Sequence, residues 1–534
     1  MAGCVAETSR PTFCGICGWC KGIRFEIQEC LSAMSSSFDF SRNEIEPYTL
    51  MTQLSSQNSG MSVVCDMHVA PQPSGPHHTL KAEMCTDCSI APRDAAIVAH
   101  HWIRFLTGAA LVCTLVITTS VASERPPTRT SSESEQLDTL IKEKKYPELL
   151  TALNNPSGLK TQDYAFFAGV LANRTNHLST SIRLLKEALP MLQKQGARDR
   201  EQVALETLAD GYSRLYRYSE AADTYAILEK RLGSQMSAEE RANVEHAALQ
   251  WGLLRQVPPQ SVSVSAAFTI ATKRNLLGVL EAPVEIRGET RYWVVDTGAN
   301  ISALSRSEAR RLGLQPLEGS AALKGVSGNL VQIHVAVAPE LCIGKARLHN
   351  VVFVLLEDQD LLVRQVHYQI DGIIGYPVLA ALARITFYRS GMFGVDVGAK
   401  PFLHKDHNLF VEKETPLAAA RIGSTSCLFM FDTGIRRSIL TARYYREHTS
   451  DFVMKRAIDQ PLAGVGGTRS ISTYVLESVP VEVGGRGTTL HDVPVLTERV
   501  GKNYDDFCGN LGLDAVQEFS AFTLDFDDMY LSVH

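Results

Sequence analysis

The chain has 534 residues, of which 45% are hydrophobic and 21% are charged, and its formal net charge is -6. This length predicts about three domains, and the composition is that of globular proteins with sizeable cores. The slightly acidic balance excludes the strongly basic class of nucleic-acid-binding proteins.

Residues 1–95 differ in composition from the rest of the chain. They contain eight of the twelve cysteines, many serines and little periodic pattern. Two clusters have the spacing of zinc-binding thiolates, namely Cys14-x-x-Cys17-x-x-Cys20 and Cys85-x-x-Cys88. Because 64 residues separate the clusters and no histidine is well spaced, we expect no metal site. A disordered leader, or a start codon assigned too far upstream, is the preferred interpretation.

A targeting segment is predicted at residues 96–123. The only long apolar run covers 103–122, has the basic residues Arg93 and Arg104 before it and at its start, and ends in small residues at Ala122 and Ser123. These are the parts of a secretory signal peptide, and the run is also long enough to be a borderline membrane anchor. Both alternatives place the chain that follows outside the cytoplasm, as a secreted, periplasmic or membrane-tethered protein.

The pattern becomes helical between residues 134 and 256. Apolar and small residues recur on helical faces, as in Phe167-Ala168-Gly169-Val170 and in Leu208-Ala209-Asp210-Gly211-Tyr212. This arrangement resembles tetratricopeptide repeats, although Gly169 and Ala209 are 40 residues apart where that repeat has about 34. Ser237-Ala238-Glu239-Glu240 is a capping box that predicts one more helix. Such a stack either recruits a protein partner or is a helical spacer packed on the rest of the chain.

A tripeptide occurs twice in the remaining β-rich sequence, after the linker Pro258-Pro259. Asp296-Thr297-Gly298 and Asp432-Thr433-Gly434 each follow a short apolar run, with 136 residues between the two Asp positions. Each carboxylate is therefore expected at the end of a strand, in a tight Gly turn. One copy alone would predict no more than a turn, so the argument depends on the repetition.

The surroundings of the two tripeptides also match. About thirty residues after each copy comes a glycine-rich tip, flanked by segments that can pair as a hairpin: Gly325-Val326-Ser327-Gly328 and Gly464-Val465-Gly466-Gly467. An apolar pair that leads into a glycine follows in each half: Asp371-Gly372-Ile373-Ile374-Gly375-Tyr376 and Gly509-Asn510-Leu511-Gly512-Leu513. Each half then closes with an alternating strand, at 383–395 and 521–533. The sequence thus predicts two copies of one β-rich lobe, at 265–398 and 399–534.

The succession of strand, D-T-G, hairpin and apolar-apolar-Gly resembles the aspartic proteases over about residues 265 to 534. Ala299 after the first D-T-G, together with the G-V-x-G tip, resembles the retroviral type more than the pepsin type. The resemblance implies an all-β bilobal fold behind the helical domain, with catalytic Asp296 and Asp432 contributed one per lobe. It also implies supporting roles for Thr297, Gly298, Thr433 and Gly434, flaps at the two glycine-rich tips, an extended polypeptide substrate and no cofactor.

The expected chemistry explains why two carboxyl groups are needed. Carboxylates about 3 Å apart share one proton, because both cannot ionise at that distance. One then accepts a proton from a bound water while the other protonates the carbonyl oxygen of the peptide bond. The flaps would fold over the peptide and hold it extended.

Two other interpretations remain open at this stage. Arg436 and Arg437 follow the second D-T-G, and a guanidinium close to Asp432 would hold that carboxyl ionised and leave a non-catalytic peptide-binding scaffold. Alternatively, each lobe could pair with its counterpart on a second chain, giving an obligate dimer. The odd number of cysteines after the apolar run, Cys342, Cys427 and Cys508, excludes complete internal pairing; Cys427 and Cys508 could bridge, but buried free thiols are the preferred expectation.

Overall fold

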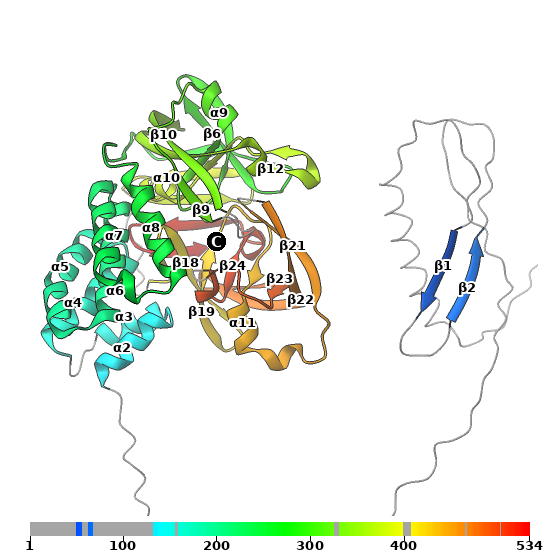
Figure 1. Ribbon diagram of the computed structural model, residues 1–534. Helices are drawn as coiled ribbons and strands as arrows, with labels where there is room; N and C mark the ends of the chain where they lie inside the picture. The colour runs from blue at the N-terminus through cyan, green and yellow to red at the C-terminus, as the bar shows by residue number, and fades with distance from the viewer. Residues whose placement is uncertain are drawn as a thin grey trace, which may run out of the picture. The chain divides into compact units, whose positions relative to one another are not determined.

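In the computed structural model the chain forms two compact units, residues 1–121 and 122–534, and each is described by itself (Figure 1). The structure describes residues 50–55, 62–67, 132–154, 159–324, 330–398, 407–464, 467–501 and 504–534. In the first unit, strands β1 (Leu50–Ser55) and β2 (Ser62–Met67) pair antiparallel.

Several sequence predictions fall outside these residues. The two cysteine clusters, most of the proposed leader and the apolar run at 103–122 are among them. Within the described ranges, no helix is long and apolar enough to cross a membrane, and no cluster of three or more potential metal ligands occurs.

The second unit begins with antiparallel helices. As predicted, Ser237 and Glu240 form a capping box that starts α8, and Ser132 with Glu135 forms another that starts α2. Gly196 has a φ of 65° and ends α5 in the left-handed conformation that glycine adopts without strain. The helices are α2 (Glu133–Lys142), α3 (Tyr146–Asn154), α4 (Thr161–Arg174), α5 (Leu178–Gln195), α6 (Arg198–Arg214), α7 (Tyr218–Leu232) and α8 (Ala238–Gly252).

Small residues let these helices approach closely. A Cβ on Gly169 would lie 2.8 Å from Cγ of Leu185, so α4 and α5 could not pack as they do with any larger residue at that position. The predicted helical region is therefore present, with Phe167, Val170 and Ala209 buried in its core.

Lobe 1 is built on a nine-stranded sheet. Its central strands are almost continuously buried, because both faces of the sheet are covered. The order is β3 (Ser261–Val264), β11 (Ala346–Leu356), β8 (Ser302–Ser305), β14 (Gly372–Ile374), β7 (Glu289–Val295), β6 (Leu280–Ile286), β10 (Leu330–Ile343) and β9 (Ala321–Lys324), with β5 (Lys273–Arg274) on β6.

Lobe 2 repeats this arrangement in an eight-stranded sheet. Strand β24 pairs parallel with β19 just as β14 pairs parallel with β7, which confirms the internal repeat inferred from the sequence. The order is β17 (Leu409–Glu412), β18 (Thr415–Ile422), β19 (Thr425–Phe431), β24 (Gly509–Leu511), β20 (Ile439–Leu440), β23 (Arg486–Leu496), β22 (Gly467–Val483) and β21 (Ile458–Gly464).

A third sheet joins the lobes. Each of the closing segments is a two-stranded hairpin, which corrects the prediction of a single alternating strand, because a turn interrupts each segment at Ser390-Gly391 and at Asp527-Asp528. The hairpins pair through β15 and β25, where the hydroxyls of Thr386 and Thr523 are 2.9 Å apart. The order is β26 (Tyr530–Val533), β25 (Ala521–Asp525), β15 (Arg384–Tyr388), β16 (Met392–Asp396) and β4 (Phe268–Ala271).

The helical region packs directly on the lobes, as in the spacer interpretation of the sequence. The carboxylate of Glu412, at the end of β17, accepts hydrogen bonds from Lys144 Nζ at 2.6 Å and from Tyr146 Oη at 2.7 Å, and it lies 3.3 Å from Arg174 Nη2. The tight turn Lys413–Glu414 follows, with both residues at positive φ. Although burial opposes it, the charges of Lys144 and Arg174 hold the pKa of Glu412 well below its ordinary value.

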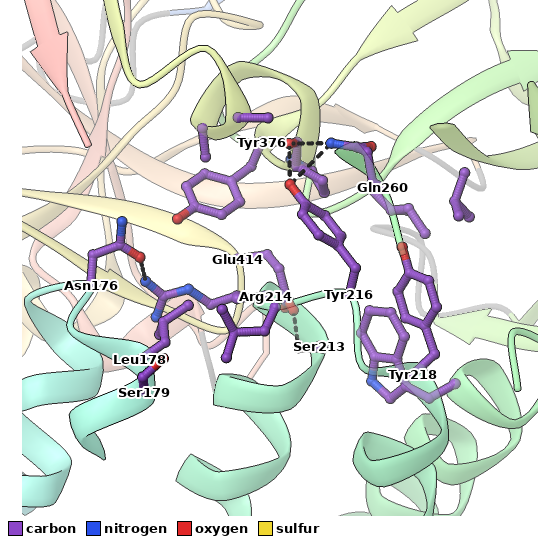
Figure 2. A pocket seen from close by; sticks show the side chains of 17 residues that line it. Asn176, Leu178, Ser179, Ser213, Arg214, Tyr216, Tyr218, Gln260, Tyr376 and Glu414 are labelled. Carbon is purple, nitrogen blue, oxygen red and sulfur yellow. Dashed lines mark hydrogen bonds between the residues drawn. The ribbon is translucent and has the colours of Figure 1, made fainter. Parts of the chain in front are cut away.

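A cavity of about 280 Å³ lies where the helices meet lobe 1 and this turn (Figure 2). Arg214 Nη2 donates to Asn176 Oδ1 at 2.6 Å on one side of it, and Tyr216 Oη donates to the carbonyl of Pro377 at 3.0 Å on the other. Glu414 lines the cavity and accepts a hydrogen bond from Ser213. Burial and the nearby Asp210 raise the pKa of Glu414 to about 8.

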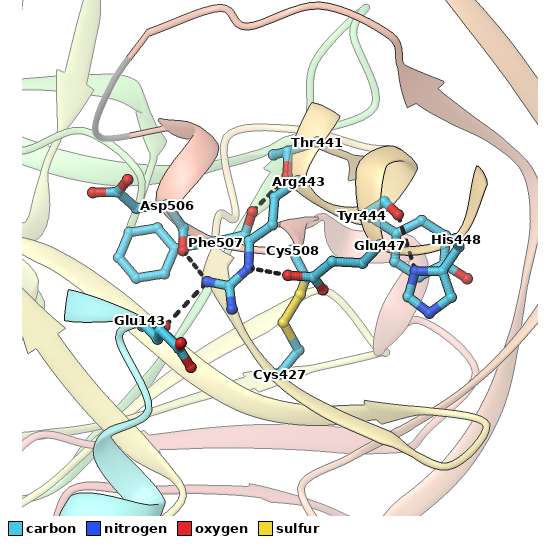
Figure 3. Close-up of a disulfide and its surroundings, with 10 residues drawn as sticks. All are labelled: Glu143, Cys427, Thr441, Arg443, Tyr444, Glu447, His448, Asp506, Phe507 and Cys508. Carbon is cyan, nitrogen blue, oxygen red and sulfur yellow. Dashed lines mark hydrogen bonds and ion pairs between the residues drawn. A yellow bond between two sulfur atoms is a disulfide. The ribbon is translucent and has the colours of Figure 1, made fainter. Parts of the chain in front are cut away.

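The structure corrects the expectation for two of the cysteines. Cys427 on β19 and Cys508 beside β24 form a disulfide, with Cα atoms 6.2 Å apart (Figure 3). The disulfide could not be predicted from the spacing of the cysteines, because the parallel pairing of β19 with β24 brings together residues 81 positions apart. Cys342 is a free thiol.

Candidate active site

The two D-T-G segments meet between the lobes. Asp296 directly follows β7 and Asp432 directly follows β19, so each strand delivers one aspartate to the same place. The backbone nitrogen of Asp296 donates to the carbonyl of Ile374 at 3.0 Å, and that of Asp432 donates to the carbonyl of Leu511 at 3.0 Å. The structure thus brings the two predicted residues together within one chain and gives them matching backbone support.

The threonines that follow the aspartates join the lobes. Thr297 Oγ1 donates to the carbonyl of Phe431 at 2.7 Å and accepts from the backbone nitrogen of Thr433 at 3.0 Å. Thr433 Oγ1 makes the reciprocal contacts, donating to the carbonyl of Val295 at 2.7 Å and accepting from the backbone nitrogen of Thr297 at 3.1 Å. Both threonines are fully buried. These four hydrogen bonds fix the distance between the two strand ends.

The glycines of both tripeptides allow the carboxyl groups to approach the opposite backbone. A Cβ on Gly298 would lie 2.5 Å from Cγ of Asp432, and a Cβ on Gly434 would overlap the carboxyl group of Asp296. No other residue type fits at either position without displacing an aspartate. Each carboxyl group therefore lies against the turn of the other lobe.

Backbone amides hold each carboxyl group in place. Asp296 Oδ1 accepts from the nitrogens of Gly298 at 2.8 Å and Ala299 at 3.2 Å, while Asp432 Oδ1 accepts from the nitrogen of Gly434 at 2.8 Å. Burial raises the pKa of both carboxyl groups, and the neighbouring Asp432 raises that of Asp296 further. The pair is therefore set to keep one proton at a pH where an isolated aspartate has lost it.

Ser302 and Ser438, which the sequence analysis did not single out, hold the segments behind the aspartates. Ser302 Oγ accepts from the nitrogen of Gly375 at 3.0 Å, and Ser438 Oγ accepts from the nitrogen of Gly512 at 3.0 Å. Each serine lies six residues after its Asp, so the signal in the sequence was the equal spacing in both repeats.

Asn510 was also missed as an individual residue. Sequence analysis placed it in an apolar pair, but its Nδ2 donates to Asp432 Oδ2 at 2.9 Å. The equivalent residue of lobe 1 is Ile373: Ile373 pairs with Val294 and Asn510 pairs with Met430, each two positions before an Asp. A polar residue where the other repeat has an apolar one was the available signal.

Arg436 and Arg437 do not neutralise the acidic pair. Both side chains are exposed, and neither forms an ion pair with Asp432 in the described parts of the two lobes. Arg436 instead lies over the turn that precedes β6 in lobe 1, where a Cβ on Gly278 would be 3.1 Å from its Cδ. The two arginines that favoured a degenerate, non-catalytic site are thus exposed and are not paired with the carboxyl group of Asp432.

The hairpins predicted to carry flaps are present at their bases. Strand β9 pairs antiparallel with β10, and β21 pairs antiparallel with β22 up to the Gly464–Gly467 pair. Residues 325–329, which include the first tip from Gly325 to Gly328, and residues 465–466 of the second tip lie outside the described ranges.

Comparisons with known proteins identify part of the same region. Residues 282–378 match the family profile described as aspartyl protease. This segment runs from β6 to the start of α10 (Tyr376–Ala381) and contains Asp296. That part of the chain is aspartic-protease-like.

Similar solved structures are distant. Basic 7S globulin from soybean is 13% identical over 51% of this chain and 94% of its own, with a TM-score of 0.32. A retropepsin-like aspartic protease from Rickettsia conorii is 17% identical over 26% of this chain and 94% of its own, with a TM-score of 0.17. The protein edgp is 10% identical over 51% and 95%, with a TM-score of 0.31. No curated protein sequence matches.

Proposed function

We propose that the chain is an aspartic endopeptidase, in which Asp296 and Asp432 activate a water that hydrolyses a peptide bond. One observation carries the proposal. Two partly exposed carboxyl groups, one from each lobe, lie against each other's glycine turn above a reciprocal hydrogen-bonded pair of threonines. The aspartyl protease match over residues 282–378 supports it.

The reaction needs one ionised and one protonated carboxyl group. The ionised group accepts a proton from the water while the water oxygen bonds to the carbonyl carbon. The protonated group gives its proton to the carbonyl oxygen, which forms a neutral tetrahedral intermediate. The nitrogen of the leaving group then takes a proton from the first carboxyl group, the C–N bond breaks, and an intermediate hydroxyl returns its proton to the second. The pair ends in the state in which it began.

The substrate proposed is an extended polypeptide. Strand pairs β9–β10 and β21–β22 project from the two lobes as hairpins, and hairpins of this kind can hold a peptide by strand-like hydrogen bonds. The glycine-rich tips at 325–328 and 464–467 are proposed to close over it.

A digest of a peptide library by the full chain tests the proposal. We expect internal cleavage that a statine-type transition-state mimic inhibits, and a rate that declines once both carboxyl groups ionise. Binding of the mimic without cleavage at any pH would contradict the proposal and leave a peptide-binding scaffold instead.

We further propose that the chain beyond residue 123 acts outside the cytoplasm. The disulfide between Cys427 and Cys508 supports this, because disulfides persist in oxidising compartments. Cell fractionation, with determination of the N-terminal residue of the mature protein, tests it; a reduced protein recovered from the cytoplasm would contradict it.

The helical region is proposed to be of the tetratricopeptide type but to serve the lobes rather than a free partner. The close contact of Gly169 with Leu185 supports the repeat type. The burial of Glu412 of lobe 2 among Lys144, Tyr146 and Arg174 supports the structural role, because the helical surface holds a turn of the same chain. Capture of a partner protein on this surface with the turn still in place would contradict it.

A further inference from the structure

The acidic pair is held asymmetrically by its surroundings. Both amides that donate to Asp296 go to the same oxygen, Oδ1. Asp432 receives a donor on each oxygen, from the nitrogen of Gly434 on Oδ1 and from Asn510 Nδ2 on Oδ2. The two halves of an otherwise repeated site therefore offer different stabilisation to a negative charge.

The difference comes from one pair of equivalent positions. Asn510 on β24 and Ile373 on β14 occupy the same place relative to their aspartates. Both are buried, with exposed fractions of 8% and 9%. An isoleucine cannot donate a hydrogen bond, whereas the amide of asparagine donates through Nδ2. Lobe 1 thus lacks the donor that lobe 2 supplies.

No other charged group in the described surroundings explains the difference. Tyr504 lies beside Asn510 and Asp432, and burial raises the pKa of its hydroxyl, so it stays neutral. Arg436 and Arg437 are exposed and make no ion pair with Asp432. Among the described residues, Asp296 is then the group beside Asp432 whose charge changes in the acidic range, and Asn510 is the donor that distinguishes the two carboxyl groups.

We propose that Asn510 is a positioning residue that divides the roles of the pair, keeping Asp432 as the ionised base and leaving the shared proton on Asp296. This inference rests on the proposed peptidase function. It assigns the proton of the attacking water to Asp432 and the protonation of the substrate carbonyl to Asp296. The causes of the pKa shifts agree: burial raises the pKa of both carboxyl groups, and the amide of Asn510 opposes that rise at Asp432 alone.

Covalent labelling of the wild-type chain tests this assignment without a substrate. An ionised carboxylate opens an epoxide, so that a C–O ester bond forms, the epoxide C–O bond breaks and the alkoxide takes a proton from water. A protonated carboxyl group instead gives its proton to a diazoacetyl ester, which loses N₂ as the ester bond forms. Peptide mapping should place the epoxide adduct on Asp432 and the diazoacetyl adduct on Asp296. The statine-type transition-state mimic should prevent the epoxide adduct from forming, because it occupies the same site. The reverse placement would overturn the proposal.

The pH dependence of kcat/KM gives a second test. In Asn510→Leu we expect the acidic limb to move upward by about one pH unit or more, the size expected for losing a hydrogen bond to a charged group. At acidic pH, kcat/KM of this variant should fall below that of the wild type. The loss should lie in kcat, with KM little changed, because the amide acts on Asp432 and not on the substrate. Ile373→Leu is the matched control, since it alters the equivalent position without removing a donor, and its profile should be that of the wild type.

The possible failures are distinguishable. An unmoved acidic limb in a folded, active Asn510→Leu variant, or a shift of the alkaline limb instead, would overturn the role of Asn510 and leave the peptidase proposal standing. Cleavage retained by Asp296→Asn would overturn the peptidase proposal itself. If Asn510→Leu does not fold, as judged by its thermal unfolding, the labelling of the wild-type chain still decides the assignment.

Discussion

Replacing Thr297 by valine removes half of the hydrogen bonds that join the lobes beneath the acidic pair. The hydroxyl of Thr297 donates to the carbonyl of Phe431 and accepts from the nitrogen of Thr433. Valine has nearly the same shape but no hydroxyl, so both partners stay buried without a hydrogen bond. Each unsatisfied group costs about 1–3 kcal/mol, so we expect the free energy of unfolding to fall by about 2–6 kcal/mol.

Thr297→Ser is the matched control for this variant. It keeps the hydroxyl and loses one methyl group, which costs about 1 kcal/mol in a buried position. Guanidinium denaturation followed by tryptophan fluorescence should therefore place the valine midpoint well below the serine midpoint. Thr433→Val should behave like Thr297→Val, because the contacts are reciprocal. Equal midpoints for the valine and serine variants would refute the reasoning.

Three further predictions concern the framework around the site. Glu412→Gln should lower the free energy of unfolding by about 3–5 kcal/mol, because it removes the charge that pairs with Lys144 and leaves Arg174 with Asp210 alone. Glu245→Gln in an exposed pair should change it by less than about 1 kcal/mol; equal effects in denaturant titrations would contradict this. The disulfide between Cys427 and Cys508 links residues 81 positions apart, so reducing it should lower the free energy of unfolding by about 4 kcal/mol. The shift of the unfolding midpoint on addition of reductant measures this, and an unchanged midpoint would argue against the bond. The pKa of Glu414 is raised to about 8, so its stabilising contribution is complete at low pH and is lost as the pH rises through that value. The free energy of unfolding should therefore decline with pH in the wild type, and Glu414→Gln should remove this decline from a series of unfolding measurements. A decline that persists in the variant would count against the assignment.

Much of the architecture could be predicted because the sequence pattern of the β-rich lobe occurs twice in one chain. The two D-T-G tripeptides, the hairpins after them and the apolar-apolar-Gly segments recur at matched distances, and this repetition favours a catalytic pair over the ordinary turn that a single Asp would indicate. The capping box at Ser237 predicted α8 because its two hydrogen bonds are local. The repeated motifs could be found by comparing the two halves of the chain, and the capping box could be found because its residues are three positions apart.

The features that were missed depend on contacts between distant residues. The disulfide needs the parallel pairing of β19 with β24, and the burial of Glu412 needs the helical region to lie against β17. The exposure of Arg436 and Arg437 is set by the turn they follow and not by their proximity in sequence to Asp432. Asn510 stands where the first repeat has Ile373, inside a segment that otherwise matches, and its contact with Asp432 is evident only from the 2.9 Å distance between its amide nitrogen and a carboxyl oxygen.

Cleavage by the two single variants Asp296→Asn and Asp432→Asn, assayed on a peptide library beside the wild type, tests the central claim most directly. Asparagine has the shape of aspartate but can neither share the proton nor accept one from water. Both variants, alone or mixed, should keep the wild-type fold and show no cleavage, because one chain supplies both carboxyl groups. Activity retained by either variant would contradict the two-lobe mechanism, and activity restored by mixing them would show that the site forms between chains.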